Sequence, residues 1–304
     1  MVVADAGPGA GLGHIARCSA IVAGLRVRGV RCRCVAVGAE EAPHSIIEWE
    51  TKKALGEIPP IAPALVLLDS YRLDAASVRD QARARRLALM HDEGPLVEPS
   101  DLIVTSDPRL VGARAEVVGG AALSPLGPRF WGLPEPLEPA HRVRRVLVTT
   151  GGGDPGGHAV AIASAVREAM PEAEVALVRG PHADFADPPG IQVLDRPESL
   201  LEPLMEADLA VTAAGNSVLE AAAVGTPAVA VVMAENQRAI ARALADHGAT
   251  ELFEPETLGR LVGAVRTLAA DPELRRQRSR RGREVVDGYG ALRVAFLIDA
   301  LLKG

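Results

Sequence analysis

The sequence predicts an α/β protein made of two doubly wound, Rossmann-like halves. Two observations lead to this prediction: short apolar runs alternate with helical stretches, and the alternation stops at a proline-rich segment and then restarts. Apolar runs of four to six residues between helices are typical of parallel strands that are buried on both faces of a sheet. A chain of 304 residues also has the length expected for two domains.

The first half contains the elements expected of one such domain, in residues 1–125. Val2 and Val3 lead into a glycine-rich loop, which is followed by a helical pattern from His14 to about Arg28. Further apolar runs predict strands at residues 32–37, 65–68, 87–90 and 102–104. Five prolines between positions 125 and 139 resist both helix and central strand, so residues 126–141 are predicted to be a linker.

Residues 142–285 repeat the alternation and are predicted to form the second domain. Apolar runs predict strands at 146–149, 175–178, 209–212 and 228–232, and helical patterns lie near 198–206, 217–224, 236–246, 257–270 and 273–303. Asp154 followed by Pro155 is a typical helix start. The arginines between Arg275 and Arg283 predict a solvated helix face. Residues 286–304 are predicted to form a C-terminal helix that returns to the N-terminal domain.

Composition excludes several classes of function. The net charge of −6 does not suit duplex nucleic acid or an anionic membrane, and aromatic residues, at 3%, are too few for stacking single-stranded bases. Three cysteines give no disulfide framework, and no apolar run is long enough to span a bilayer. We therefore expect a cytoplasmic protein. His91, Asp92 and Glu93 are better explained as a strand-end turn than as metal ligands, so neither a metal nor a cofactor is expected.

Loops that follow strands carry the candidate binding residues, because ligands of open α/β sheets bind beyond the carboxyl ends of the strands. The first loop, Gly7 to Gly13, precedes a helix whose free N–H groups suit an anion. His14 begins that helix, where a neutral ring can accept a proton. A histidine that only caps the helix explains this position equally well.

Three stretches of the second half have the same character. The turn with Gly152 and Gly153 can line an anion site or simply connect strand to helix. Ser217 begins a helix that suits a diphosphate, and Glu220 can hold ribose hydroxyls or close a capping box with Ser217. Asn236 and Gln237 offer amides for sugar hydroxyls, with an N-cap by Asn236 as the alternative.

Seven stretches, in order along the chain, together resemble the PseG-type nucleotide-sugar hydrolases. They are GLGHIAR (11–17), DSYRLD (69–74), MHDEG (90–94), the loop with Gly152, AAGNSVLEAAAVGTPAVAV (213–231), ENQ (235–237) and DGYGALRV (287–294). That family removes UDP from a diacetamido-trideoxyhexose on the route to pseudaminic acid and is similar in fold to the MurG glycosyltransferase. The resemblance implies a GT-B fold, in which two Rossmann-like domains with parallel sheets face each other across a cleft, and assigns nucleotide binding to the C-terminal one.

The resemblance also implies roles for individual residues. His14 matches the histidine that activates the attacking water, and Tyr71 matches a tyrosine near the sugar. Glu220 matches the carboxylate that binds ribose. The other substrate-binding residues it implies are Gly11, Gly13, Arg17, Gly152, Gly153, Gly215, Asn216, Ser217, Asn236 and Gln237.

The function expected first is therefore hydrolysis of a UDP-(diacetamido-trideoxy)hexose-like substrate, with water attacking the anomeric carbon and UDP leaving. One alternative is a glycosyltransferase of the same fold that uses a nucleotide-sugar donor and a small-molecule acceptor. Another is a nucleotide-sugar-binding protein without catalysis. A hydrolysing epimerase fits the N-terminal pattern less well, and a serine hydrolase is disfavoured because the chain has no G-x-S-x-G motif.

Overall fold

The computed structural model describes residues 1–6, 13–39, 45–92, 100–106, 110–112, 114, 116–136, 138–154 and 156–304. The chain divides into two compact units. Unit 1 comprises Met1–Trp131 together with Gly288–Gly304, and unit 2 comprises Gly132–Asp287. The boundary after Trp131 falls inside the segment predicted as a linker. Gly11, Glu93 and Pro155, which the sequence singled out, lie outside the described residues.

Unit 1 is built on a seven-stranded parallel sheet with the order β3-β2-β1-β4-β5-β6-β7. The strands are β1 Val2–Asp5, β2 Cys34–Val37, β3 Glu50–Lys52, β4 Leu65–Asp69, β5 Arg86–Met90, β6 Leu102–Thr105 and β7 Val117–Gly119. The helices are α1 Gly13–Val27, α2 Ala75–Ala82 and α9 Gly290–Lys303, with 3-10 turns at Leu55–Glu57, Ala121–Leu123 and Pro128–Phe130.

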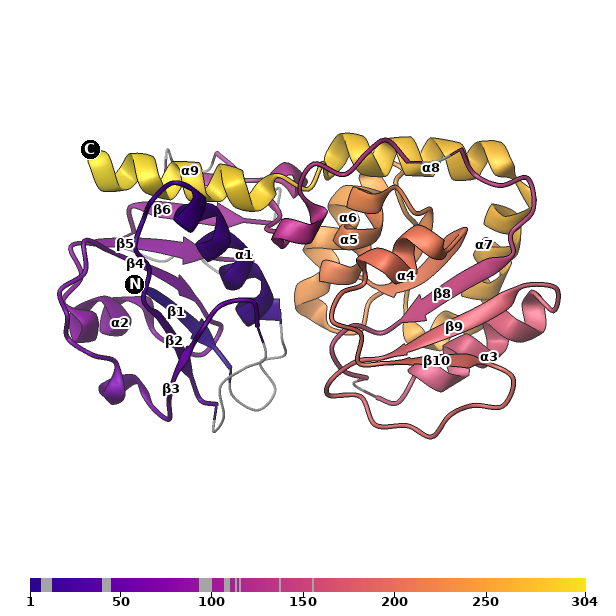
Figure 1. The fold of residues 1–304 in the computed structure, drawn as a ribbon, viewed down its shortest axis with the longest axis horizontal. Helices are drawn as coiled ribbons and strands as arrows, with labels where there is room; N and C mark the ends of the chain where they lie inside the picture. Colours follow the sequence, from indigo (N-terminus) through magenta and orange to yellow (C-terminus); the bar gives the residue numbers. More distant parts are fainter. Residues whose placement is uncertain are drawn as a thin grey trace. The chain divides into compact units, whose positions relative to one another are not determined.

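The two faces of this sheet carry separate apolar clusters, as the alternation of side chains along a strand requires. Val2 and Ala4 of β1 pack in the cluster that includes α1 and α9, whereas Val3 packs in the cluster that includes α2. Figure 1 shows α9, from the end of the chain, lying beside α1. Gly24 allows this close contact: a Cβ atom there would lie only 3.0 Å from the Cβ atom of Ala295.

Unit 2 is built on a six-stranded parallel sheet with the order β10-β9-β8-β11-β12-β13. The strands are β8 Arg145–Thr149, β9 Glu174–Arg179, β10 Gln192–Asp195, β11 Leu209–Ala213, β12 Ala228–Val231 and β13 Leu252–Phe253. The helices are α3 Ala159–Ala169, α4 Leu201–Glu206, α5 Asn216–Val224, α6 Arg238–Asp246, α7 Leu258–Ala270 and α8 Pro272–Val285, with 3-10 turns at Glu235–Gln237 and Pro255–Thr257. The prediction of two doubly wound parallel sheets is confirmed.

The strands that the sequence did not predict are the sheet edges, namely β3, β7, β10 and β13. Each is only two to four residues long and is partly exposed. An edge strand has a neighbour on one side only and need not be covered on both faces. It therefore lacks the continuous apolar run that identifies a central strand.

Two predicted helix boundaries are wrong. The pattern at 273–303 is two helices, because the chain leaves α8 after Val285 and restarts at Gly290, with Gly288 at a φ of +85°. In addition, α3 begins at Ala159 and not beside Asp154. The turn between them is closed by the Asp154 carboxylate, which accepts hydrogen bonds from the backbone N–H groups of His158 and Ala159.

The prediction that the arginines of 275–283 form a solvated face is also wrong for part of the run. Arg275 is fully buried and donates to the carbonyls of Leu268, at 2.8 Å, and Ala140, at 2.5 Å. Arg278 is 5% exposed and pairs with Glu251. Arg275 thus serves as an internal hydrogen-bond donor for backbone carbonyls, and Arg278 as the partner of a carboxylate.

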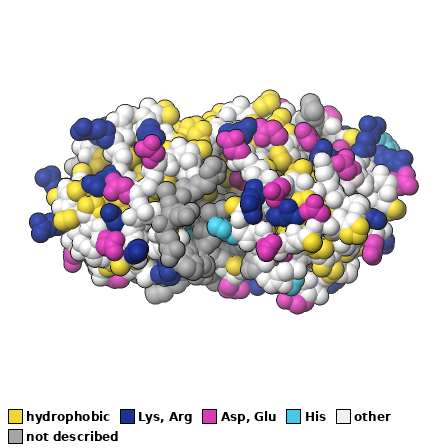
Figure 2. All heavy atoms as spheres, turned by 60° about the horizontal axis from the view of Figure 1, so that its bottom comes forward, with side chains coloured by type: hydrophobic (Ala, Val, Ile, Leu, Met, Phe, Trp, Pro, Cys, Tyr) yellow, Lys and Arg dark blue, Asp and Glu magenta, His cyan; other side chains and the backbone are white. Residues whose placement is uncertain are grey.

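No helix among the described residues is both long and apolar enough to cross a membrane. Figure 2 shows acidic and basic side chains interspersed over the visible face, without a broad area of one sign.

Candidate active site

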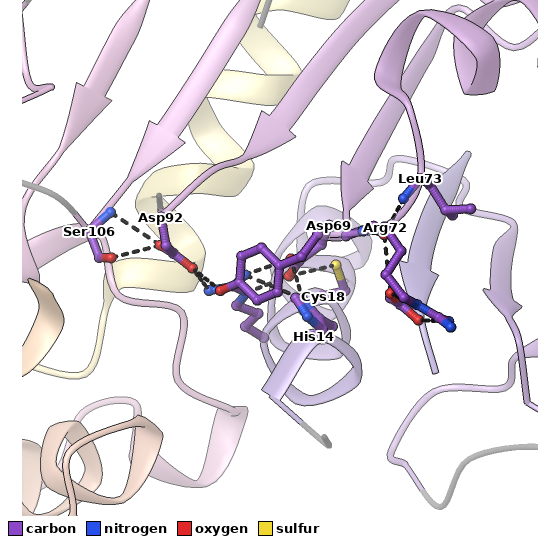
Figure 3. A network of polar contacts seen from close by, with 11 residues as sticks. His14, Cys18, Asp69, Arg72, Leu73, Asp92 and Ser106 are labelled. Carbon is purple, nitrogen blue, oxygen red and sulfur yellow. Dashed lines mark hydrogen bonds and ion pairs between the residues drawn. The ribbon is translucent and has the colours of Figure 1, made fainter. Parts of the chain in front are cut away.

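Unit 1 gathers a buried polar cluster at the carboxyl ends of its central strands (Figure 3). We use the name His14 cluster for His14, Arg17, Cys18, Asp69, Tyr71, Asp92 and Ser106. His14, Arg17 and Cys18 lie in the first turns of α1, whereas the others lie at or just after the ends of β4, β5 and β6. Parallel strands bring their carboxyl ends to one edge, which is why segments distant in sequence meet here.

The His14 ring is paired with a buried carboxylate. Its Nδ1 atom lies 2.5 Å from Oδ1 of Asp69, and the two residues are 3% and 0% exposed. Because a carboxylate only accepts hydrogen bonds, Nδ1 carries the proton and donates it to Asp69. The opposite nitrogen, Nε2, then holds a free lone pair, and no described residue bonds to it. Asp69 thus fixes His14 in the form that can accept a proton.

Arg17 lies between two buried aspartates. Its Nε and Nη2 atoms donate to Asp69, with Nη2 2.6 Å from Oδ1, and its Nη1 atom donates to Asp92. Burial alone would raise the pKa of Asp69, but the Arg17 charge and the hydrogen bond from His14 hold this pKa below its usual range. Both aspartates therefore stay ionised in the interior.

The Asp92 carboxylate accepts hydrogen bonds from Ser106 and Tyr71 in addition to Arg17. Ser106 donates from its hydroxyl at 2.7 Å, and Tyr71 donates from its phenol at 3.0 Å. Burial alone would raise the pKa of Asp92, but the Arg17 charge and the hydrogen bonds that this carboxylate accepts lower its pKa to about 2. The thiol of Cys18 is the weakest donor of the cluster, 3.7 Å from Asp69, and its pKa is raised by burial and then by the Asp69 charge.

Tyr71 forms the open side of the cluster. Its ring meets the His14 ring edge to face, with centroids 4.7 Å apart, and 41% of the residue is exposed. Gly13, the first residue of α1, is exposed, and a Cβ atom there would meet nothing within 4 Å. The structure therefore brings together His14, Arg17 and Tyr71 of the predicted set, and places Gly13 next to His14.

A second ion pair lies at the end of the neighbouring strand. Asp5, which ends β1, is 1% exposed and is bound by both Nε and Nη2 of Arg72, with the Nε–Oδ2 distance 2.7 Å. Ser70 donates to the same carboxylate at 3.2 Å. Asp5 is thus a buried aspartate at the end of a neighbouring strand that is bound by Arg72 and Ser70.

In unit 2, a hydrogen bond, a β-bridge and close packing hold the predicted glycine turn in place. Gly152 accepts a hydrogen bond from the N–H group of His182 at 2.8 Å, and Gly153 forms a bridge with the same residue. Gly180 packs closely against the turn, since a Cβ atom there would come within 2.3 Å of the Gly151 carbonyl oxygen. The turn at 151–153 thus has a fixed position at the end of β8.

The start of α5 adjoins that turn. Gly215 is its N-cap and offers no side-chain hydrogen bond, and Asn216 is its first residue. A Cβ atom on Gly151 would lie 3.9 Å from the hydroxyl of Ser217, which is buried. Unlike α3, whose first N–H groups are already bonded to Asp154, α5 has a glycine N-cap that supplies no side-chain hydrogen bond. Of the two helix starts in unit 2, α3 is closed by Asp154, whereas α5, which the sequence proposed for a diphosphate, has only a glycine N-cap.

Glu220 does not close a capping box, so this alternative is wrong. A capping box needs Ser217 at the N-cap and the glutamate three residues on, but α5 begins at Asn216. No described residue hydrogen bonds to the Glu220 carboxyl. Burial raises the pKa of Glu220 to about 8, although part of the residue remains exposed. A carboxyl group enclosed without a partner is typical of a position completed by a ligand.

Asn236 and Gln237 follow β12 in a short 3-10 turn. Gln237 accepts a hydrogen bond from the N–H group of Met233 at 3.0 Å, and its amide nitrogen points to Gly215, where a Cβ atom would lie 3.4 Å away. Asn236 caps no helix, since the turn has Ala234 at its N-cap and α6 has Gln237. The N-cap alternative is therefore wrong, and Gln237 belongs with the start of α5.

The sequence did not assign roles to Asp69, Asp92 and Ser106, which complete the His14 cluster. Asp69 was present in the sequence as the last residue of an apolar run, and Asp92 follows the next run by two residues. Polar residues that end central strands were the available signal. The described residues contain no group of three or more His, Cys, Asp or Glu side chains that could hold a metal ion.

Comparisons with known proteins agree with this architecture. Residues 183–288 match the glycosyltransferase family 28 C-terminal domain. The Bacillus subtilis (strain 168) "Spore coat polysaccharide biosynthesis protein SpsG" is 24% identical, with 99% of this chain and 98% of that protein aligned.

Three solved structures have similar folds over nearly the whole chain. MurG of Acinetobacter baumannii is 17% identical with a TM-score of 0.63, over 98% of this chain and 99% of MurG. The calicheamicin glycosyltransferase CalG4 is 17% identical with a TM-score of 0.64, over 99% and 98%. The fold is GT-B. A complex of Staphylococcus aureus MnaA with UDP is 13% identical with a TM-score of 0.64, over 99% and 96%.

Proposed function

We propose that this GT-B chain is an enzyme that cleaves a nucleotide sugar between the anomeric carbon and the diphosphate. The observation that carries the proposal is the 2.5 Å contact between His14 Nδ1 and the buried Asp69 carboxylate. A histidine that merely caps a helix does not need a buried carboxylate behind it. A histidine that takes a proton does, because the carboxylate stabilises the charged ring that results.

The proposed reaction uses this geometry in the following way. Nε2 of His14 removes the proton from a hydroxyl group, and the oxygen attacks the anomeric carbon. The bond from that carbon to the diphosphate oxygen breaks, and the nucleoside diphosphate leaves with the electron pair. Arg17 is assigned to hold Asp69 in place and not to touch the substrate, because it is 7% exposed and three of its nitrogens already donate to aspartates.

Unit 2 is assigned to the nucleotide part of the substrate. The N-terminus of α5, with Gly215, Asn216 and Ser217, offers N–H groups and a positive dipole end to the diphosphate. Glu220 would accept hydrogen bonds from ribose hydroxyls, which supply the partners that its carboxyl lacks. The fold similarity to the UDP complex of MnaA supports a uridine nucleotide.

Transfer to an acceptor hydroxyl is the first candidate for the overall reaction. It is supported by the match to a glycosyltransferase domain and by the fold similarity to the calicheamicin glycosyltransferase. Transfer also needs nothing beyond what the His14 cluster offers, since an alcohol and a water molecule present the same O–H group to a base.

Hydrolysis is the second candidate, and one observation favours it. The GLGHIAR and DSYRLD stretches, which resemble the PseG-type hydrolases, supply His14 and Tyr71, and these two rings are in contact although 57 positions apart in sequence. The release of UDP from a UDP-diacetamido-trideoxyhexose would be the corresponding reaction.

The test is a screen of UDP- and TDP-sugars for release of the nucleoside diphosphate, with and without small alcohol acceptors. Release that depends on an acceptor supports transfer, and release in buffer alone supports hydrolysis. Binding of UDP without release from any sugar would overturn the proposal in favour of a binding protein. Unchanged turnover in His14→Ala would remove His14 as the base.

A further inference from the structure

The His14 cluster contains an excess of negative charge that the reaction described above does not explain. Asp69 and Asp92 carry two negative charges, and Arg17 carries one positive charge. All three are less than a tenth exposed, as is His14. With a neutral His14 ring the cluster therefore has a net charge of −1, and with a protonated ring it has a net charge of zero.

A buried negative charge without a counter-charge is costly, so the second carboxylate stabilises the positive charge that the ring acquires during turnover. The Asp69 carboxylate alone would not balance the charges of both Arg17 and a protonated ring. Asp69 shares its charge with Arg17 through two nitrogens, and that pair is already neutral before His14 takes a proton. The additional negative charge comes from Asp92, which contacts the third nitrogen of Arg17.

We infer that Asp92 is a positioning residue that acts on His14 through Arg17 and supplies the counter-charge for the protonated ring. The inference rests on the proposed role of His14 as a base, because only a base needs its charged form to be stabilised during turnover. Asp92 does not contact His14. It reaches the ring through Arg17, whose Nη2 atom lies 3.4 Å from His14 Nδ1.

The other groups around the ring do not replace this charge. On α1 the neighbouring titratable groups are Arg17 and the neutral thiol of Cys18, at the end of β4 there is Asp69, and in the following loop there is Tyr71. The hydroxyls of Ser106 and Tyr71 both donate to Asp92, which keeps this carboxylate ionised and fixed. Among the described residues of the cluster, Asp92 thus supplies the second negative charge, in addition to the Asp69 carboxylate that contacts the ring directly.

The experiment compares two variants for which charge balance requires opposite results. Asp92→Asn keeps the shape of the side chain and removes one negative charge, whereas Arg17→Gln removes the positive charge. The titration of His14 is followed by NMR of protein labelled at histidine, with the signal assigned by its loss in His14→Gln. The midpoint should move about one pH unit lower in Asp92→Asn and about one unit higher in Arg17→Gln.

Asp5→Asn is the matched control. Asp5 is also a buried aspartate at a strand end and is bound by an arginine, but its partner is Arg72. The His14 midpoint should move by no more than about 0.3 pH unit in this variant. Equal shifts in Asp5→Asn and Asp92→Asn would overturn the inference, and so would shifts of the same sign in Asp92→Asn and Arg17→Gln, since loss of structure acts in one direction.

The kinetic measurement separates this inference from the proposed function. The acid limb of the kcat/KM profile of Asp92→Asn should move to lower pH with the NMR midpoint, and the plateau should fall about tenfold because the base is weaker. The NMR titration needs no substrate. Absence of turnover in the wild-type protein would therefore refute the proposed function, whereas an unmoved NMR midpoint in Asp92→Asn would refute the role of Asp92.

Discussion

Replacing Asp69 with asparagine tests the pairing on which the proposed chemistry depends. The amide has the shape of the carboxylate but presents one oxygen and one NH₂ group. Arg17 donates to both oxygens of Asp69, and its Nε atom, which donates to Oδ2, holds the amide oxygen at that position. The NH₂ group then takes the position of Oδ1 beside His14, whose Nδ1 atom must accept a hydrogen bond in place of donating one. The ring proton moves to Nε2, and the nitrogen that should remove the substrate proton is no longer free.

The expected loss is large and appears mainly in kcat. Reversing the tautomer of a histidine base in this way costs a factor of about 10³ to 10⁴ in rate, or roughly 4 to 5 kcal/mol. KM should change by less than about threefold, because Asp69 is fully buried and does not reach the substrate. The fold should survive, since removing the charge of one buried partner costs on the order of 3 kcal/mol.

The assay is steady-state release of the nucleoside diphosphate, combined with denaturant unfolding of each variant. A double-mutant cycle with His14→Ala decides the mechanism. If Asp69 acts through His14, Asp69→Asn should cause almost no further loss of kcat once the imidazole is gone. A loss in the His14→Ala background as large as that in the wild-type protein would refute the reasoning, because Asp69 would then act independently of His14.

Three further predictions concern the rest of the molecule. Glu220→Gln should remove a pH dependence of the folding stability. Burial raises the pKa of Glu220 to about 8, so the folded chain keeps a proton that the unfolded chain loses above about pH 4.5. The wild-type protein therefore becomes less stable as the pH rises from 4.5 to 8. Melting from pH 5 to 8 should therefore show a smaller decline of Tm in Glu220→Gln, and an equal decline would contradict this reasoning. Gly180→Ala should weaken UDP binding at least tenfold, measured by calorimetry, because its Cβ atom would displace the turn that carries Gly152; Gly259→Ala, which meets nothing within 4 Å, should bind normally. Gly24→Val should destabilise unit 1 by about 2 kcal/mol in urea unfolding, since the added atoms overlap α9, and unchanged stability would show that this helix is not packed as described.

The central part of each sheet could be predicted from the sequence because burial on both faces demands an apolar run. Residues 65–68 and 228–232 are of this kind, and both correspond to strands β4 and β12. The edges could not be predicted, since β3 reads Glu-Thr-Lys and is partly exposed. Its strand conformation comes from pairing with β2, which is information that a local pattern does not contain.

Helix starts show the same division between local and tertiary information. At Asp154 the sequence has the residues of a helix start, but the carboxylate reaches forward to the N–H groups of His158 and Ala159 and the helix begins later. At α5 the N-cap is a glycine, which itself supplies no side-chain hydrogen bond to the first N–H groups. The two starts look equally suitable in sequence, and only the side-chain direction of Asp154 distinguishes them.

The sequence predicted His14 as a site residue but did not predict its partner, Asp69. The reason is the order of the strands in the sheet. Asp5 and Asp69 both end apolar strands, and both are buried at the same edge. The strands β1 and β4 are neighbours, so either carboxylate could have been the one that meets α1. The choice is made by the two arginines, because Arg72 follows β4 and turns back to Asp5, which leaves Asp69 to Arg17 and His14. Exchanging the charges of the Asp5–Arg72 pair should therefore disturb the order of this strand edge without changing the acid limb of the rate profile, whereas any change of charge at Asp69 or Asp92 should move that limb.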